Sequence, residues 1–232
     1  MDSPLKIFHG SPNAVNAPSL AAGRPRNDFG RGFYCNADWQ LAAEWACKSR
    51  NDGFVNEYSL NAAPLRTLDL LSGEYSVLHW IALLLRNRTF SLQLDAARQA
   101  REFMIKNYLL DTACYDIVIG YRADDSYFSY AQAFVENGLT IRQLSQALRL
   151  GNLGEQIVLV SERAFENLRF LGAHGVKAAD HYPRFKRRDT AARMDYRKAI
   201  TCSPIADDDL FVFDIMRKGV DIDDWRIQRN LP

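Results

Sequence analysis

The sequence predicts an α+β fold, in which short strands and helices follow one another without strict β-α-β alternation. Two short apolar runs are typical of β-strands, one near the N-terminus at Leu5–Phe8 and one much later in the chain at Ile157–Val160. Segments with helical periodicity lie between them, and no internal repeat or low-complexity tract interrupts the order. The chain has 232 residues, 47% of them hydrophobic, which is enough to bury a core in one large domain or two small ones.

The first elements surround a long loop. Leu5–Phe8 predicts a strand that stops at His9-Gly10. Residues 11–31 are rich in Ser, Pro, Asn and Gly, and a loop of this length in a compact domain is usually functional or disordered. Phe33-Tyr34 predicts a brief β segment, and Asp38 predicts the N-cap of a helix that follows it.

The middle of the chain predicts two strands, several helices and one buried strand. Phe54–Leu60 and Leu65–Leu70 alternate apolar and polar residues, with Ala63-Pro64 between them, so we expect an antiparallel pair. The β-branched run Asp116–Tyr121 predicts a buried strand. Helical periodicity predicts helices at 75–87, 92–109, 126–136 and 140–149.

In the tail, from residue 173 onward, basic residues gather over 184–198 and acidic residues over 207–224. We therefore expect a domain over 1–172 and a charged C-terminal extension over 173–232 that packs on it. The simplest expectation is a solvated basic helix paired with an acidic partner, and the alternative is a contact to a phosphate backbone or a partner-binding arm. The basic residues are Arg184, Lys186, Arg187, Arg188, Arg193, Arg197 and Lys198, and the acidic ones are Asp207–Asp209, Asp214, Asp221, Asp223 and Asp224.

Composition excludes several classes of protein. The formal net charge of +1 argues against a grip on nucleic acid or membrane by bulk electrostatics. No apolar run approaches the about 20 residues that span a bilayer, and no secretion signal is evident. Metal-ligand spacing is missing, and the four cysteines are too far apart for a CxxC motif, which predicts a cytoplasmic protein with free thiols: Cys35, Cys47, Cys114 and Cys202.

The residues with the clearest chemistry follow the first strand. Gly30 and Gly32 flank one residue, which permits positive φ and close approach of the backbone to a ligand. Tyr34 then offers a flat π-face beside exposed amides. His9, at a strand end, can donate a hydrogen bond to a hydroxyl while its other nitrogen is held by the scaffold. This order predicts a nucleotide-like ligand, with a ring stacked on Tyr34 and a ribose at His9.

His9-Gly10-Ser11 and Gly30–Tyr34 resemble the first two motifs of the His-Tyr-Glu class of ADP-ribosyltransferases, which includes poly(ADP-ribose) polymerases and diphtheria-type toxins. The resemblance implies that NAD is the substrate and that no metal takes part. It implies that His9 contacts the ribose of the nicotinamide half, that the Gly10 backbone holds the carboxamide and that Tyr34 stacks on nicotinamide. Trp45 stands where the class often places a second stacking aromatic.

Gly154–Val160 is similar to the third motif of that class, which opens a later strand with an acidic or amide residue. Side chains alternate across a strand, so only one of Glu155 and Gln156 can point into the cleft. Glu155 offers the better chemistry, because a glutamate can act as a base. Gln156 fits the register of the downstream residues better. We favour Gln156 slightly and keep both.

The chain also resembles a bacterial branch of this superfamily, a domain of unknown function with the motifs HGS, DFGxGFY, YRADDSYF and LGxLGEQIV. This resemblance extends through about residue 170. Members often lie beside a small partner gene, which implies a toxin or regulatory role with an antitoxin-like protein partner.

Polar residues after the buried strand extend the predicted site. Arg122 would pair with the NAD pyrophosphate, and Asp124 or Asp125 would contact the acceptor or ribose. The alternative is that Asp125 or Ser126 caps the helix that starts at Tyr127 and that Arg122 pairs with the aspartates. Arg24 and Arg26 are alternative pyrophosphate ligands. The full set predicted to bind NAD is His9, Gly10, Ser11, Asn27, Phe29, Gly32, Tyr34, Trp45 and Arg122.

The expected function is therefore mono-ADP-ribosyl transfer from NAD to an unidentified protein or nucleic acid. Positive charge that develops on the ribose favours a nearby carboxylate or amide oxygen. A base would act on the nucleophile; if Gln156 faces the cleft, that base is Glu155, Asp124, Asp125 or the acceptor itself. The alternatives are an NAD glycohydrolase, with water as acceptor, and a catalytically inactive module that binds NAD or a partner.

Overall fold

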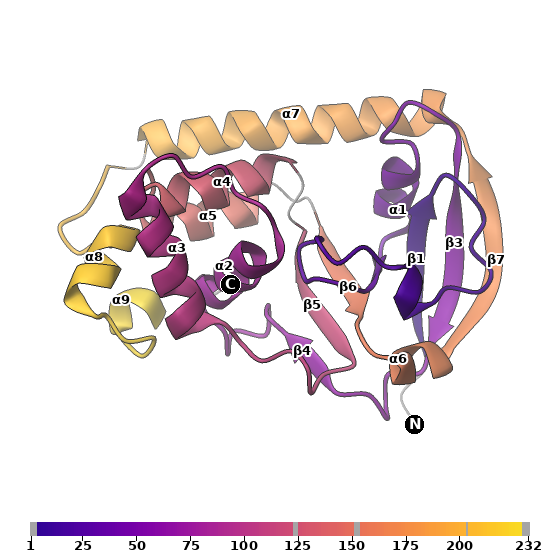
Figure 1. Ribbon diagram of the computed structural model, residues 1–232. Helices are drawn as coiled ribbons and strands as arrows, with labels where there is room; N and C mark the ends of the chain where they lie inside the picture. The colour runs from indigo at the N-terminus through magenta and orange to yellow at the C-terminus, as the bar shows by residue number, and fades with distance from the viewer. Residues whose placement is uncertain (1–3, 123–124, 151–153, 203, 229–232) are drawn as a thin grey trace.

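The computed structural model describes residues 4–122, 125–150, 154–202 and 204–228 and has an α+β fold. Two separate sheets form its framework, and most of the helices gather beside the second sheet (Figure 1). One sheet has the strand order β1-β3-β7 and the other the order β2-β6-β5-β4. The long helix α7 (Ala178–Cys202) lies along the top of the molecule and spans both parts (Figure 1).

The first sheet is antiparallel and has β3 at its centre. Its strands are β1 (Leu5–Ser11), β3 (Gly53–Leu60) and β7 (Leu168–Val176). His9 of β1 lies opposite Asn56 of β3 in the register. β7 runs across residue 172, where the sequence predicted the domain to end, so the tail leaves directly from this sheet.

The second sheet carries the strands that follow the glycine turn and the late apolar run. They are β2 (Phe33–Cys35), β6 (Glu155–Leu159), β5 (Ile117–Tyr121) and β4 (Thr67–Asp69). β6 pairs with both β2 and β5 in antiparallel fashion, whereas β4 runs parallel to β5. These four strands confirm the predicted segments near Phe33-Tyr34, Leu65–Leu70, Asp116–Tyr121 and Ile157–Val160.

The predicted antiparallel pair of Phe54–Leu60 with Leu65–Leu70 is wrong. β3 uses both of its edges for β1 and β7, while β4 belongs to the other sheet. The chain changes sheets between them, where the Asp116 carboxylate accepts from the Arg66 backbone N–H (2.9 Å) and the Asp116 N–H donates back to Arg66 O (2.8 Å). The alternating pattern located both strands correctly, but their partners are distant in sequence.

The predicted helices are confirmed with small changes at their ends. α1 begins after Asp38, whose carboxylate accepts from the backbone N–H groups of Gln40 and Leu41. The apolar faces of the helices beside the second sheet form the largest hydrophobic cluster, together with Leu210, Val212 and Ile215 from the tail. The remaining helices are η1 (Leu20–Ala22), α1 (Trp39–Ala46), α2 (Val77–Asn87), α3 (Asp95–Tyr108), α4 (Asp125–Val135), α5 (Ile141–Leu150), α6 (Glu162–Glu166), α8 (Val212–Lys218) and α9 (Trp225–Gln228).

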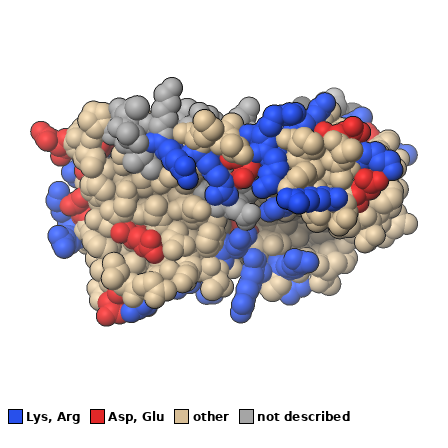
Figure 2. Space-filling model, turned by 90° about the horizontal axis from the view of Figure 1, so that it is seen from above, with Lys and Arg blue, Asp and Glu red and all other residues tan. Residues whose placement is uncertain are grey.

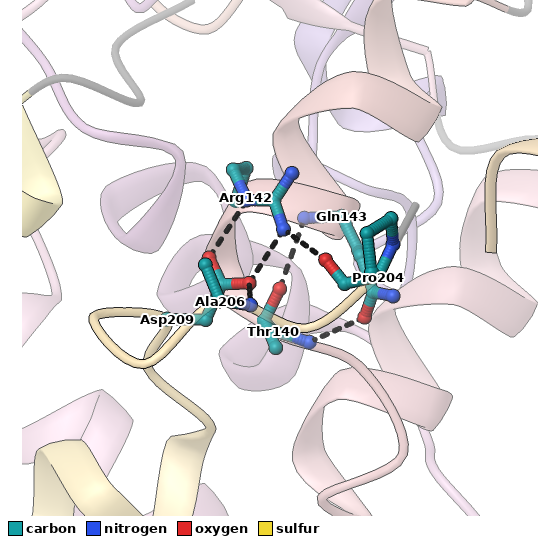
Figure 3. Close-up of polar contacts among 6 residues, drawn as sticks. All are labelled: Thr140, Arg142, Gln143, Pro204, Ala206 and Asp209. Carbon is teal, nitrogen blue, oxygen red and sulfur yellow. Dashed lines mark hydrogen bonds and ion pairs between the residues drawn. The ribbon is translucent and has the colours of Figure 1, made fainter. Parts of the chain in front are cut away.

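A partly buried ion pair between Arg142 and Asp209 fixes the tail to the start of α5 (Figure 3). Both oxygens of the Asp209 carboxylate accept from the Arg142 guanidinium, at 2.7 and 2.6 Å. Arg142 also donates to Pro204 O, and the Ala206 N–H donates to Asp209. Bidentate pairs of this kind are strong and geometrically specific. The segment after α7 is therefore held against the helices.

The charged residues of the tail find partners in several places. Arg188 of α7 pairs with Glu44 of α1, so an ion pair attaches α7 to the first part of the molecule. Arg193 pairs with Asp189 one turn away on the same helix. In the acidic segment, Asp209 pairs with Arg142 and Asp224 with Arg226. These pairs differ from the expected pairing between the basic helix and the acidic segment.

Seen from above, Lys and Arg side chains gather over the middle of the molecule (Figure 2).

Candidate functional site

A cavity of about 480 Å³ lies where the two sheets meet, and side chains from three different strands line it. His9 comes from β1, Tyr34 from β2 and Gln156 from β6. The long loop between β1 and β2 forms another wall. The predicted residues that line the cavity are His9, Gly10, Ser11, Arg24, Asn27, Gly32, Tyr34, Trp45, Arg122 and Gln156.

His9 is held by the backbone of the neighbouring strand. Its Nδ1 lies 2.7 Å from Tyr34 O, and its ring packs against Phe33 with centroids 4.4 Å apart. A carbonyl oxygen only accepts, so Nδ1 carries the proton and donates. Burial lowers the pKa of His9, which favours the neutral ring. Nε2 is then a hydrogen-bond acceptor, whereas the sequence predicted that this nitrogen donates to a hydroxyl.

The Tyr34 ring is fixed by its own glycine turn. The hydroxyl donates to Gly30 O (2.7 Å) and accepts from the Phe29 N–H (3.0 Å). Gly30 has φ +80, a left-handed conformation that suits glycine and bends this turn back toward the ring. Burial raises the pKa of Tyr34, so the phenol stays protonated and donates. The ring is therefore presented to the cavity in one orientation.

Two glycines allow the cavity walls to approach closely. A Cβ on Gly10 would lie 2.0 Å from the backbone oxygen of Ala42, because β1 packs directly on α1. A Cβ on Gly32 would lie 2.6 Å from the Val158 side chain on β6. Neither contact is sterically possible without movement of the neighbouring element. The cavity thus depends on glycine for its packing as well as for backbone exposure.

The structure separates the two candidates for the third motif. Gln156 is 7% exposed and lines the cavity, and its Oε1 is buried with no hydrogen-bond partner among the residues that the structure describes. Glu155 is exposed and does not line the cavity. Alternation along β6 explains the difference, since neighbours point to opposite faces of a strand. An amide, and not a carboxylate, therefore faces His9 and Tyr34 across the space.

Trp45 and Arg122 form one side of the cavity. The Arg122 guanidinium carbon lies 3.9 Å from the centre of the Trp45 ring, a cation–π contact. Trp45 is 37% exposed and also lies 4.5 Å from Lys48 Nζ, while Arg122 is buried. The Arg122 guanidinium thus stacks on Trp45, the side chain that the sequence predicted as a second stacking aromatic.

An ion pair between Arg88 and Asp28 holds the turn that contains Gly30 and Gly32. Arg88 donates to the Asp28 carboxylate at 2.8 Å, and the Asn87 amide donates to Asp28 O at 3.2 Å. Arg88 itself lines the cavity. Arg88 could not be predicted as a site residue, because nothing in the local pattern at the end of α2 indicates contact with a turn so distant in sequence.

The remaining predicted residues lie elsewhere. Phe29 is buried under the second sheet, where its ring contacts Gly120, and does not line the cavity. Arg26 lines a separate cavity. Asp124 lies outside the described residues. Asp125 begins α4, and the structure does not describe its side chain.

Two asparagines that sequence reasoning missed belong to the site. Asn36 is 7% exposed and lines the cavity, and its Oδ1 has no hydrogen-bond partner. The period-2 rule could have found Asn36, because it lies two residues after Tyr34 on the same side of the chain. Asn56 is fully buried and donates to His9 O (3.1 Å) and Ser11 Oγ (2.9 Å), while it accepts from the Val15 N–H (2.7 Å). Asn56 therefore ties the long loop to the end of β1.

Within the described ranges, no group of three or more His, Cys, Asp or Glu side chains is arranged to hold a metal ion. Cys35 and Cys47 are buried free thiols, and Cys114 is an exposed one. The same ranges contain no helix with the length and apolar character needed to cross a membrane.

The family described as "Protein of unknown function (DUF3990)" matches residues 5–170. This segment runs from β1 into β7 and includes every residue that lines the cavity, while α7 and the helices after it lie outside the match. None of the curated proteins and none of the solved structures is significantly similar to the chain. Because the match covers most of the sequence, the chain belongs to the DUF3990 family.

Proposed function

We propose that this member of the DUF3990 family binds NAD in the cavity between its two sheets and transfers ADP-ribose to a macromolecule. The observation that carries the proposal is the convergence of His9, Tyr34 and Gln156, from three strands, on one cavity. These are the three positions that the resemblance to ADP-ribosyltransferases requires to meet. Their separation in sequence makes an accidental meeting in one cavity improbable.

The donors and acceptors of the cavity suit NAD. Gln156 Oε1 and Asn36 Oδ1 are buried acceptors without a partner, and an unsatisfied buried polar atom costs about 1–3 kcal/mol. His9 Nε2 is a third acceptor. The ribose hydroxyls and the carboxamide of NAD supply the hydrogen-bond donors that such atoms need. Arg24, Arg88 and Arg122 line the same cavity and provide positive charge for the pyrophosphate.

In the proposed reaction the bond between nicotinamide and the ribose C1 breaks, and its electron pair leaves with nicotinamide. The nucleophile of the acceptor forms the new bond to C1 and gives its proton to a base that the acceptor itself supplies. Tyr34 would hold the nicotinamide ring by stacking, since its hydroxyl fixes the ring plane. The dipole of the Gln156 amide would orient the ribose and stabilise developing positive charge.

Gln156 cannot take the acceptor's proton, because an amide is not a base. Asp28, the carboxylate residue that lines the cavity among the described residues, is bound to Arg88. This favours a second candidate function, an NAD-binding module without turnover, since the carboxylate of Glu155 faces away. The two functions share the bound state and differ in the release of nicotinamide.

Calorimetry with NAD and a nicotinamide-release assay test both. We expect NAD to bind, and Gln156→Ala and Tyr34→Ala each to weaken binding at least tenfold. Glu155→Ala is the matched control on the neighbouring residue, and we expect unchanged affinity. Nicotinamide release that depends on added cell extract, with label transferred to macromolecules, supports the transferase.

Other outcomes separate the alternatives. Release of nicotinamide with free ADP-ribose and no labelled macromolecule would identify a glycohydrolase. Binding without release under any condition would identify the inactive module. Equal loss of NAD affinity in Glu155→Ala and Gln156→Ala would contradict the assignment of the amide to the site.

A further inference from the structure

A second cavity, of about 350 Å³, lies beside the first and is lined by five arginines. They come from three separate segments: the long loop before β2, the C-terminal end of α2 with the residues after it, and the first half of α3. Arg88 lines both cavities, so the two share a wall. The five are Arg26, Arg86, Arg88, Arg98 and Arg101.

The charge of this cavity is only partly compensated. Arg88 pairs with Asp28 and Arg98 with Asp95, so among the described residues two of the five positive charges have carboxylate partners and three do not. In the part of the chain that the structure describes, Arg26 and Arg86 make no ion pair or hydrogen bond, and both are exposed. Like charges gathered around one cavity repel each other, and an anionic ligand relieves this repulsion.

Arg98 and Arg101 donate to backbone carbonyls but keep further N–H donors for an anion in the cavity. Arg101 donates from Nε and Nη2 to Leu85 O, at 3.2 and 2.9 Å, and Arg98 donates to Leu92 O and Gln93 O. The Arg101 bonds satisfy a carbonyl in the last turn of α2 and offset the partial negative charge of that helix end, whereas the Arg98 bonds satisfy carbonyls of the loop just before α3. A guanidinium has five N–H donors in a planar fork, so each still offers donors that match phosphate oxygens.

We propose that the second cavity holds the phosphodiester backbone of a single-stranded nucleic acid, which is the acceptor of the reaction proposed above. A run of positive charge leads from Arg26 and Arg86 through the shared Arg88 to Arg24 in the first cavity. A chain held here by its phosphates would place its next nucleotide at the first cavity. Phe90 also lines the second cavity, and positive grooves with aromatic side chains are typical of single-strand binding.

The net charge of the whole chain does not conflict with this site. The total of +1 averages regions of opposite sign, and phosphate binding depends on the local concentration of arginines. The acceptor role rests on the proposed function, whereas binding of the strand does not require NAD. The two can therefore be tested apart.

The test is fluorescence anisotropy of a fluorescein-labelled single-stranded 12-nucleotide RNA, and of DNA with the same sequence, at several NaCl concentrations without NAD. For Arg26→Gln/Arg86→Gln we expect about tenfold weaker binding, and a slope of log K against log salt shallower by about 1.4, at about 0.7 per phosphate contact. The control Lys186→Gln/Arg187→Gln removes two exposed charges from α7 and should change affinity less than twofold. NAD affinity should be unchanged in both double variants.

Several results would overturn the proposal. Equal losses in the two double variants would mean that general surface charge holds the strand. Tripolyphosphate that displaces the RNA at equal phosphate concentration would mean a site for a small anion. Poly-glutamate that binds as tightly as RNA through Arg26 and Arg86 would mean an acidic protein partner. If RNA binds through these arginines but neither NAD binding nor nicotinamide release occurs, the phosphate site stands and the acceptor role fails with the proposed function.

Discussion

The two neighbouring cavities share Arg88 but are built from different parts of the fold. Strands form the first, and its polar groups are buried and oriented: His9 by a backbone carbonyl, Tyr34 by its glycine turn. A loop and helix ends form the second, and its charges are mostly exposed. The first cavity is therefore specific through shape and unsatisfied hydrogen bonds, and the second through positive charge beside the aromatic ring of Phe90. Substitutions should therefore affect stability at the first cavity and salt-dependent binding at the second.

The largest expected effect is that of Gly10→Ala at the wall of the first cavity. The added Cβ would lie 2.0 Å from Ala42 O, so α1 must move away from β1 and carry Trp45 with it. Overpacking against backbone should cost about 3 kcal/mol of unfolding free energy, which lowers Tm by about 6–12 °C in a chain of this size. Thermal unfolding followed by circular dichroism measures the shift.

Two controls accompany that variant. Gly175→Ala adds the same atom where nothing lies within 4 Å, so Tm should stay within about 2 °C. Arg86→Ala at the second cavity should change the unfolding free energy by less than about 0.5 kcal/mol. A stable Gly10→Ala variant that still binds NAD would show that the first cavity is not closely packed.

Gln156→Met should separate stability from binding. It replaces a buried amide whose oxygen has no partner with an apolar side chain of similar length, so we expect the unfolding free energy of the ligand-free protein to rise by about 1 kcal/mol. NAD binding should be lost. Urea denaturation and calorimetry measure the two effects.

Gln143 provides the matched comparison for Gln156. It is equally buried, but its Oε1 accepts from the Thr140 N–H at 3.1 Å. Gln143→Met should therefore lower the unfolding free energy by about 1–2 kcal/mol. Stability losses of the same size in both variants would mean that Gln156 is a structural residue and no ligand contact.

The smallest expected effect is the pH dependence that His9 contributes at the first cavity. Burial lowers the pKa of His9, so the folded protein binds a proton less readily than the unfolded chain. Stability is then constant above about pH 6.5 and falls as the pH drops below it, where the unfolded chain takes up protons first. NAD affinity should fall at lower pH than stability does, where the ring of the folded protein itself takes up a proton, because the neutral ring supplies Nε2 as acceptor.

Denaturation curves between pH 5.5 and 8 check the effect, and His9→Gln should reduce the slope below pH 6.5. Part of the slope will remain, because burial also lowers the pKa values of His79 and His181. RNA binding at the second cavity should not change over this range, since arginine stays protonated. NAD affinity that rises as the pH falls below 6.5 would contradict the neutral form of His9.

Much of the local structure could be predicted from the sequence. Asp38 indicated the start of α1 because an N-cap carboxylate acts on the next few amides. The strand segments followed from alternation, and the order of His9, the glycine turn and Tyr34 indicated residues that line one cavity. Strand pairing could not be predicted in the same way. β3 pairs with β1 and β7 and not with the next strand, because pairing depends on contacts between residues distant in sequence.

The sequence by itself determined that Glu155 and Gln156 face opposite sides of one strand, since alternation is a local property of the extended backbone. Which side of β6 faces the cavity depends on tertiary contacts, because the pairing of β6 with β2 and β5 sets the orientation of the strand. In the same way, the sequence contained all the arginines but did not group them. Arg24 and Arg26 lie two residues apart and line different cavities, because the loop that carries them passes between the two.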